Sequence, residues 1–196
     1  MTDLQSLVAP TCEGLAGVLA DDVWDQPSLC EKWLVRHVVA HVTMPARLTP
    51  EQFGAEMAAA GGDFGVLSDT VAARDAALPR AELLGQLRSP VLHSWQPPGG
   101  GAAGALSHAV IHSLDVTIPL DRPAAAPAEA VAAVLEGLTA ARGAWFGIDL
   151  TGVRLEATDT GWGWGEGRPV RAGSGALVAL LSGRTLPDGS TLPRRA

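Results

Sequence analysis

The stretch Ser107–Asp115, with sequence SHAVIHSLD, predicts the helix around which this chain folds. Small and apolar side chains fill most of the stretch and the residues before it, which predicts a buried helix. His108 and His112 are four residues apart, so their imidazoles lie on one helix face, one turn apart. Buried imidazoles need polar partners. The pair can bind one metal ion, or it can be two hydrogen-bonded core histidines.

A second helix carries further histidines and is expected over about residues 33–44. Ser28 and Glu31 have the spacing of a capping box and predict its start. His37 and His41 lie on this helix, again four residues apart. They share a face, so periodicity alone leaves either of them as the third ligand.

Three imidazoles from two helices can meet in the core of a helical bundle, where such folds build metal sites. Three neutral histidines on a divalent ion leave a position open for water or substrate, as in catalytic zinc sites. Zinc is the first choice, and nickel, copper and iron also suit imidazole. Asp115 can accept a hydrogen bond from a ligating histidine, or it can be a capping or surface carboxylate near the end of the helix.

The composition limits the possible partners and the compartment. The chain has 196 residues, 47% of them hydrophobic, and a formal net charge of −7. It has no basic run apart from Arg194-Arg195, so we expect neither nucleic acid nor an anionic membrane as a partner. The apolar runs are too short to span a bilayer, and the N-terminus lacks a basic signal region. Two cysteines are too few for a disulfide framework, which indicates a reducing cytoplasm.

The chain divides near residue 148. Helical periodicity and capping signals predict helices up to that point, whereas residues 153–158 alternate with period two and indicate a strand. We therefore expect a helical bundle over residues 1–147 and a small α/β domain over residues 148–196 that packs on it. Before the boundary the expected helices cover about residues 4–19, 33–44, 50–60, 66–78, 79–95, 102–116 and 128–142.

Other side chains with chemical potential have simpler interpretations. His93 has no partner at useful spacing and is read as an ordinary polar residue. Cys30 can be a nucleophile, but outside a Cys/His motif a buried structural thiol is the simpler interpretation. The six tryptophans are read as packing residues, although Trp162 and Trp164 in a glycine-rich turn can also line a site mouth.

The order of these motifs resembles a known family. Residues 24–33, WDQPSLCEKW, followed by the VVAHV that contains His41, resemble the opening of the mycothiol-dependent maleylpyruvate isomerase family. The pattern from His108 to Asp115 is similar to that family's second metal motif. Segments of the tail, among them those ending in Arg171 and Arg184, are similar to its C-terminal domain.

The resemblance implies a mainly α fold, a DinB-like metal-binding four-helix bundle with a small α/β C-terminal domain. It also implies His41 as the first metal ligand, beside His108 and His112, a divalent metal, most often zinc, and mycothiol as cosubstrate. Three features depart from the family pattern. His108 stands where the isomerase branch often has Glu, which brings the set closer to the S-transferase type. The usual helix-capping pair is replaced by Leu34 and His37, so we expect Ser28 and Glu31 to reset the helix start. The chain is also short in its middle and tail.

The functional expectation is a metal-dependent enzyme that uses a low-molecular-weight thiol. A metal-bound thiolate would attack a small electrophile, and the enzyme is an isomerase if the thiol leaves again and an S-transferase if it stays. Asp115, Arg171 and Arg184 are the candidate catalytic residues, the arginines as clamps for a carboxylate or else as solvated surface residues. The alternative is a non-catalytic metal-containing binding module. The chain is expected to act as a monomer or homodimer.

Overall fold

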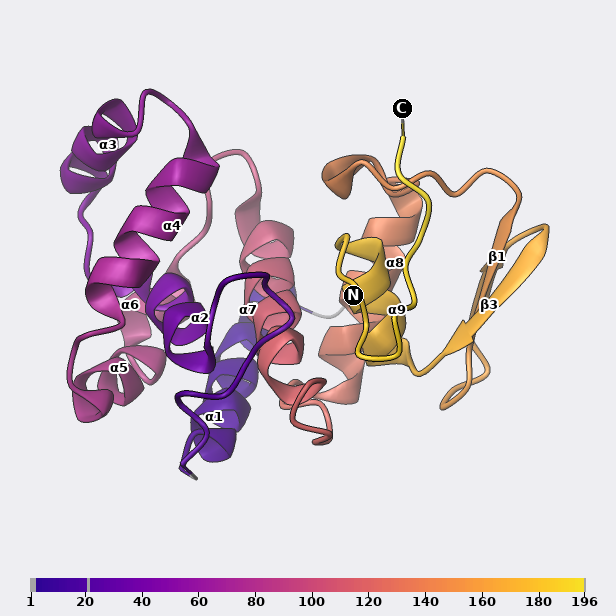
Figure 1. The fold of residues 1–196 in the computed structure, drawn as a ribbon, viewed down its shortest axis with the longest axis horizontal. Helices are drawn as coiled ribbons and strands as arrows, with labels where there is room; N and C mark the ends of the chain where they lie inside the picture. Colours follow the sequence, from indigo (N-terminus) through magenta and orange to yellow (C-terminus); the bar gives the residue numbers. More distant parts are fainter. Residues whose placement is uncertain (1–2, 21, 196) are drawn as a thin grey trace.

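The computed structural model describes residues 3–20 and 22–195 of the chain. It shows a mainly helical protein that carries a small three-stranded sheet near its C-terminus (Figure 1). The predicted fold class is therefore confirmed. The helices up to the boundary region are η1 (Leu4–Leu7), α1 (Val8–Val18), α2 (Val35–Val42), η2 (Met44–Ala46), α3 (Pro50–Ala59), α4 (Phe64–Asp75), α5 (Arg80–Leu87), α6 (Pro90–Ser94), α7 (Gly101–Thr117), α8 (Ala128–Ala140) and η3 (Ala144–Phe146).

α7 is the central element of the molecule. It contacts α1 and α2 on one side and α8 and α9 (Ser174–Leu181) on the other, while α2 also packs against α4 (Figure 1). The buried apolar side chains of α1, α2, α7, α8 and α9 form one continuous core, which includes Leu15, Val38, Leu114, Leu135 and Leu180. Leu67 and Val71 of α4 belong to a second, smaller cluster with Met44. α7 is buried along most of its length, as its composition predicts.

Prolines set two of the helix boundaries. Pro10 lies in the first turn of α1, where a missing N–H is tolerated, and the chain enters α1 from η1. The single helix predicted over residues 79–95 is divided into α5 and α6. Ser89 is the N-cap of α6: its Oγ accepts a hydrogen bond from the N–H of Val91 at 3.2 Å, and Pro90 follows it at the first helical position.

The start of α2 differs from the prediction. Ser28 and Glu31 do not cap it: the Oγ of Ser28 donates to the carbonyl of Trp33 at 2.7 Å and so closes the loop before the helix. His37 has the capping role instead, because its Nδ1 accepts the N–H of Leu34 at 3.1 Å. The predicted capping box was wrong because the hydroxyl finds its partners within the loop.

The sheet has the order β2-β1-β3, with β1 (Val153–Ala157) in the middle. β2 (Gly163–Gly165) is antiparallel to it and β3 (Arg168–Ala172) is parallel, so that Leu155 faces Trp164 on one side and Val170 on the other. The turn between β2 and β3 requires glycine. Gly167 has a φ of 121°, and a Cβ there would lie 2.2 Å from the carbonyl oxygen of Gly152.

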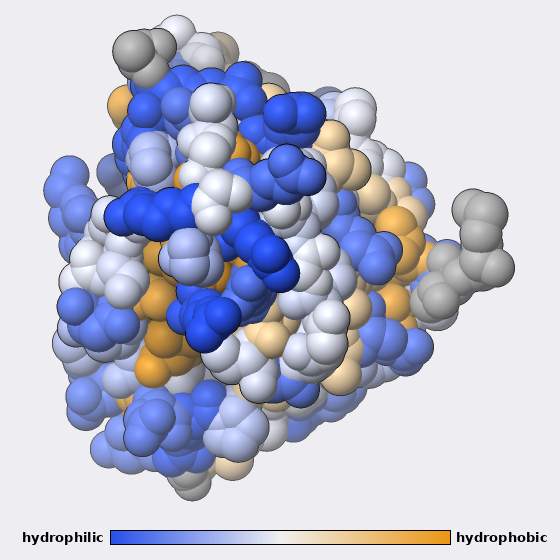
Figure 2. Space-filling model, turned by 90° about the vertical axis from the view of Figure 1, so that its right-hand side faces the viewer, coloured by the Kyte–Doolittle hydropathy of each residue, from blue (hydrophilic) through white to orange (hydrophobic). Residues whose placement is uncertain are grey.

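The sheet has one buried face and one exposed face. Val153, Leu155 and Ala157 point inward, and α9 packs against β1 and β3 as well as against α7 and α8. Figure 2 shows the side of the molecule that carries the sheet, where hydrophilic residues are mixed with residues of intermediate hydropathy and some hydrophobic ones. The strands begin after the predicted boundary near residue 148, but the division into domains stays a prediction. No helix within the described residues has both the length and the hydrophobicity needed to cross a bilayer.

Candidate metal centre

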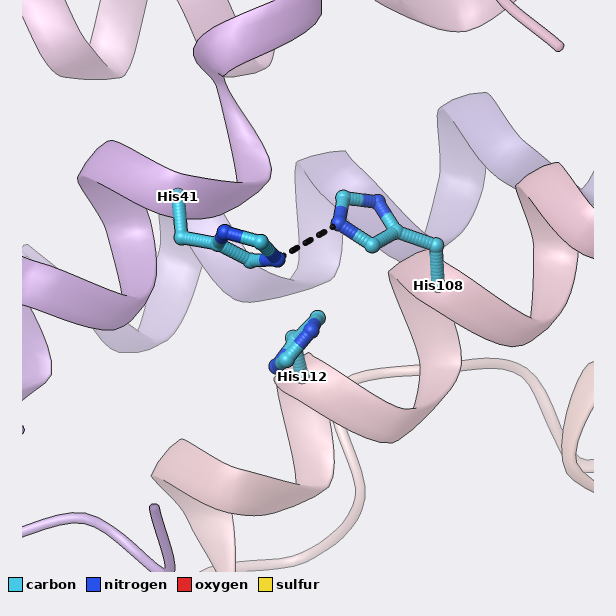
Figure 3. A group of neighbouring side chains, drawn as sticks. All are labelled: His41, His108 and His112. Atoms are coloured by element: carbon cyan, nitrogen blue, oxygen red, sulfur yellow. Dashed lines mark hydrogen bonds between the residues drawn. The ribbon is translucent and has the colours of Figure 1, made fainter. Parts of the chain in front are cut away.

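Three histidines converge between α2 and α7. In Figure 3, His41 projects from α2, and His108 and His112 project from successive turns of α7, so that all three rings point toward one another. The Nε2 atoms of His41 and His108 are 3.2 Å apart. One nitrogen from each ring lies within 4.8 Å of the others, and the ring centroids are 4.7 to 5.1 Å apart. The structure therefore brings together the three histidines predicted as metal ligands.

Aromatic side chains surround the histidines. The ring centroid of Trp33 lies 5.1 Å from that of His41, and Trp95 lies 5.4 Å from His108. Burial, together with the neighbouring imidazole of His112, lowers the pKa of His108 to about 3 and that of His41 well below its usual value. Both imidazoles are thus neutral at physiological pH, which is the state in which histidine binds metals.

Asp115 determines which nitrogen of His112 is available. Asp115 is fully buried, and its Oδ2 lies 2.8 Å from the Nδ1 of His112. Burial raises the pKa of Asp115, but hydrogen bonds from His112 and Arg184 outweigh burial and hold this pKa well below its usual range. The ionised carboxylate can only accept, so Nδ1 carries a proton, and the neutral form of the ring then has its lone pair on Nε2. This is the carboxylate–histidine arrangement that supports metal ligands in proteins.

The geometry fits a divalent ion between the three rings. Zinc–nitrogen bonds of about 2.0–2.1 Å in a tetrahedral site place two ligand nitrogens about 3.3–3.4 Å apart. The 3.2 Å between His41 and His108 is close to that spacing. The Nδ1 of His41 is buried and has no hydrogen-bond partner among the described residues. His112 differs from it, because its Nδ1 is hydrogen-bonded to the carboxylate of Asp115.

A second group of potential ligands lies beside the first and consists of Cys30, His112 and Asp115. Arg184 already contacts two of its members. Its Nε donates to Asp115 Oδ1 at 2.8 Å, and its Nη2 donates to Oδ2 at 2.9 Å and to the Sγ of Cys30 at 3.5 Å. A guanidinium in this position repels a cation. The trihistidine cluster is therefore the metal candidate, and the second group is a hydrogen-bonded support behind it.

The cluster borders a cavity of about 920 Å³, within the range of small-molecule sites. His41 and His112 line it together with side chains from the loop before α2, from the start of α4 and from the C-terminal tail. Those with polar or aromatic groups are Ser28, Cys30, Glu31, Trp33, Phe64, Ser68, Asp69, Arg184, Thr185 and Arg194. A ligand that contacts the metal position can thus contact both the bundle and the tail.

The remaining predicted residues lie in other places. His37 caps α2, and His93 binds the carbonyl of Leu87 at 2.7 Å through its Nε2. Arg171 is exposed on β3 and pairs with Glu156 at 2.6 Å. Its side chain is not part of the cavity lining, and its catalytic role stays a prediction.

Sequence reasoning missed the contact of Cys30 with Asp115 and the position of Arg194. Cys30 lies inside the family-like segment of residues 24–33, so its place in a motif was a signal that could have been used. Arg194 lies near the C-terminus, in the basic pair with Arg195, and no spacing within the sequence connects it with the histidines.

One protein family matches the N-terminal part of this chain. Residues 10–93 match the model of the mycothiol maleylpyruvate isomerase N-terminal domain. The resemblance to this family is confirmed there. The segment matched to the mycothiol maleylpyruvate isomerase N-terminal domain contains His41, whereas His108, His112 and Asp115 lie after it.

Two solved structures resemble the whole chain. They are the mycothiol-dependent maleylpyruvate isomerase and a histidine-to-alanine mutant of it, each 16% identical to this chain and covering 98% of it and 95% of their own length. The TM-scores are 0.53 for the mutant and 0.46 for the other structure. At this identity the likeness to the mutant shows a shared fold. No curated protein matches the chain.

Proposed function

We propose that this protein binds a divalent metal ion, zinc in the first place and nickel as the alternative, through His41, His108 and His112. We further propose that it uses a low-molecular-weight thiol of the mycothiol type to act on a small electrophile. The observation that carries the proposal is the convergence of three imidazoles beside a ligand-sized cavity, with His112 oriented by Asp115. The matched N-terminal domain supports mycothiol as the thiol.

The protein contributes a preformed set of three imidazoles and a cavity beside them. A bound divalent ion would lower the pKa of a thiol to which it is coordinated, so that thiolate is present at neutral pH. His41 and His108 are held neutral by burial, and Asp115 fixes His112 in the Nδ1–H tautomer. Trp33 and Phe64 line the cavity next to His41 and supply aromatic surface there.

Arg194 is suited to bind an anionic group of the electrophile. Among the described residues it has no carboxylate partner, and its Nη2 donates to the carbonyl of Gly183 at 3.0 Å. Gly183 has a φ of 79°, and a Cβ there would lie 3.0 Å from the same Nη2, so glycine leaves room for the guanidinium. The tail next to it is fixed, since Asp149 N–H donates to the Pro193 carbonyl at 2.8 Å. Guanidinium groups bind carboxylates in a bidentate manner.

The chemistry is a reversible addition. The sulfur of the thiol forms a bond to one carbon of an activated double bond, and the electron pair moves to the other carbon next to the carbonyl group. Rotation about the new single bond and loss of the thiol return the isomerised alkene. Protonation of the second carbon instead gives a stable thioether, the product of an S-transferase.

Monoethyl maleate with mycothiol, or with the neutral mimic N-acetylcysteamine, tests both outcomes. Metal-loaded protein should convert it to monoethyl fumarate or to the thioether faster than protein stripped by a chelator, as followed by proton NMR. His112→Ala should abolish the difference and His93→Ala should not. Equal rates in loaded and stripped protein would contradict the proposal and favour the binding-module alternative.

A further inference from the structure

The carboxylate of Asp115 connects three separate parts of the chain. Cys30 reaches it from the loop before α2, His112 from α7 and Arg184 from the tail after α9. Sγ of Cys30 lies 3.0 Å from Oδ2, which also accepts from His112 Nδ1 at 2.8 Å and from Arg184 Nη2 at 2.9 Å. Oδ1 accepts from Arg184 Nε at 2.8 Å. Both oxygens of a fully buried carboxylate are therefore occupied.

The direction of each hydrogen bond follows from chemistry. An ionised carboxylate only accepts and a guanidinium only donates, so the thiol must donate its S–H to Asp115 and can accept from Arg184 on the same sulfur. Cys30 thus bridges the two charged groups as a neutral thiol. Burial and the nearby charge of Asp115 raise the pKa of the Cys30 thiol, in agreement with its role as a hydrogen-bond donor.

Arg184 uses all three nitrogens of its guanidinium group in hydrogen bonds within the protein, and its side chain also borders the cavity. Besides Asp115 and Cys30 it donates through Nη1 to the carbonyl of Ser182 at 3.3 Å. The carboxylate that this arginine binds is thus an internal one. The positive charge of Arg184 offsets the buried negative charge of Asp115, which would otherwise be costly to bury next to apolar helices.

We propose that Cys30 and Arg184 are positioning residues of the metal centre, which hold Asp115 so that it fixes the Nδ1–H tautomer of His112 and directs Nε2 to the metal. The effect on metal affinity rests on the proposed function, whereas the effect on the tautomer does not. Through Arg184 the C-terminal tail thereby contributes to the metal affinity of a site whose ligands all come from the bundle.

Cys12 offers a matched control for Cys30. It is the other free cysteine of the described residues and is buried in α1. Burial raises its pKa to about 12, so it is also a neutral thiol, yet no contact with Asp115 or with the histidines is found for it. Removing either thiol deletes a buried sulfur, but only at Cys30 does this also remove a partner of Asp115.

Two readouts test the proposal on Cys30→Ala, Cys30→Ser and Cys12→Ala. Zinc affinity is measured by competition with a chromophoric chelator, and the tautomer of His112 by imidazole ¹⁵N NMR of metal-free protein. Cys30→Ala should weaken zinc binding by about tenfold or less, since losing a direct partner of a ligating histidine costs about ten- to a hundredfold and Cys30 acts one contact further away. It should also introduce the second tautomer of His112. Cys30→Ser should keep most of the zinc affinity and of the Nδ1–H tautomer, because the serine hydroxyl can donate to Asp115. Cys12→Ala should change neither the zinc affinity nor the tautomer.

Arg184→Lys and Arg184→Gln extend the test to the tail, with folding checked by circular dichroism. Both should lower zinc affinity, and the glutamine variant more than the lysine variant, since lysine keeps the charge. Equal behaviour of Cys30→Ala and Cys12→Ala in both readouts would overturn the proposal. If wild-type protein bound no zinc, the proposed function would fail, and the tautomer measurement would still decide the role of Cys30.

Discussion

Zinc binding to this protein should release few protons at pH 6. Burial lowers the pKa of His108 to about 3 and that of His41 well below its usual value, so neither carries a proton for the metal to displace. A histidine with an ordinary pKa of about 6.5 is roughly three-quarters protonated at pH 6. Three such ligands would together release about 2.3 protons. His41 and His108 would contribute almost none of these protons, so we expect a release of about one proton or fewer.

Isothermal titration calorimetry measures this number directly. Zinc is titrated into metal-free protein at pH 6.0 in two weakly chelating buffers that differ in ionisation enthalpy, and the difference in apparent binding enthalpy gives the protons released. A release of about two or more would refute the reasoning, because it would mean that the buried imidazoles are charged before the metal binds. The same titration on His37→Ala serves as a control, since His37 lies outside the cluster.

Three further predictions concern stability and recognition. Below about pH 6.5 the unfolded chain protonates His41 and His108, whereas burial keeps both neutral in the folded chain, His108 down to about pH 3. The free energy of unfolding of metal-free protein should therefore fall as the pH is lowered. The slope should reach about 1.4 kcal/mol per pH unit for each histidine in urea titrations, and a flat profile would contradict it. His37→Ala should cost about 1 kcal/mol in the same assay through loss of the α2 cap, with zinc retained. Arg194→Gln should raise the KM for monoethyl maleate about tenfold or more but leave the KM for diethyl maleate, which has no carboxylate, unchanged. Arg168→Gln on the sheet is the control, and equal changes for both esters would exclude a contact of Arg194 with the carboxylate.

The elements were predictable where local signals are strong. The apolar composition of α7 and the four-residue spacing of its histidines placed both imidazoles on one face, as observed. The alternation in β1 likewise appears as buried Val153 and Leu155 beside exposed Arg154. These features depend on neighbours a few residues away, which a sequence displays directly.

The support of the site was less predictable, because it depends on contacts between distant residues. Arg184 meets Asp115 across 69 positions, and Cys30 meets it across 85. Arg194 comes to the cavity only because the tail is hydrogen-bonded beside Ile148. The choice between His37 and His41 is similar: both share a helix face, and only the position of α7 opposite His41 separates a ligand candidate from a helix cap.

The metal content of the purified protein and its histidine variants tests the central claim most directly. Each protein is reconstituted with zinc, dialysed and analysed by inductively coupled plasma mass spectrometry. Wild type, His37→Ala and His93→Ala should retain about one divalent ion per chain, the number that a single three-histidine site holds. His41→Ala, His108→Ala and His112→Ala should each lose it. Wild-type protein without metal, or a filled site in His41→Ala beside an empty one in His37→Ala, would contradict the account.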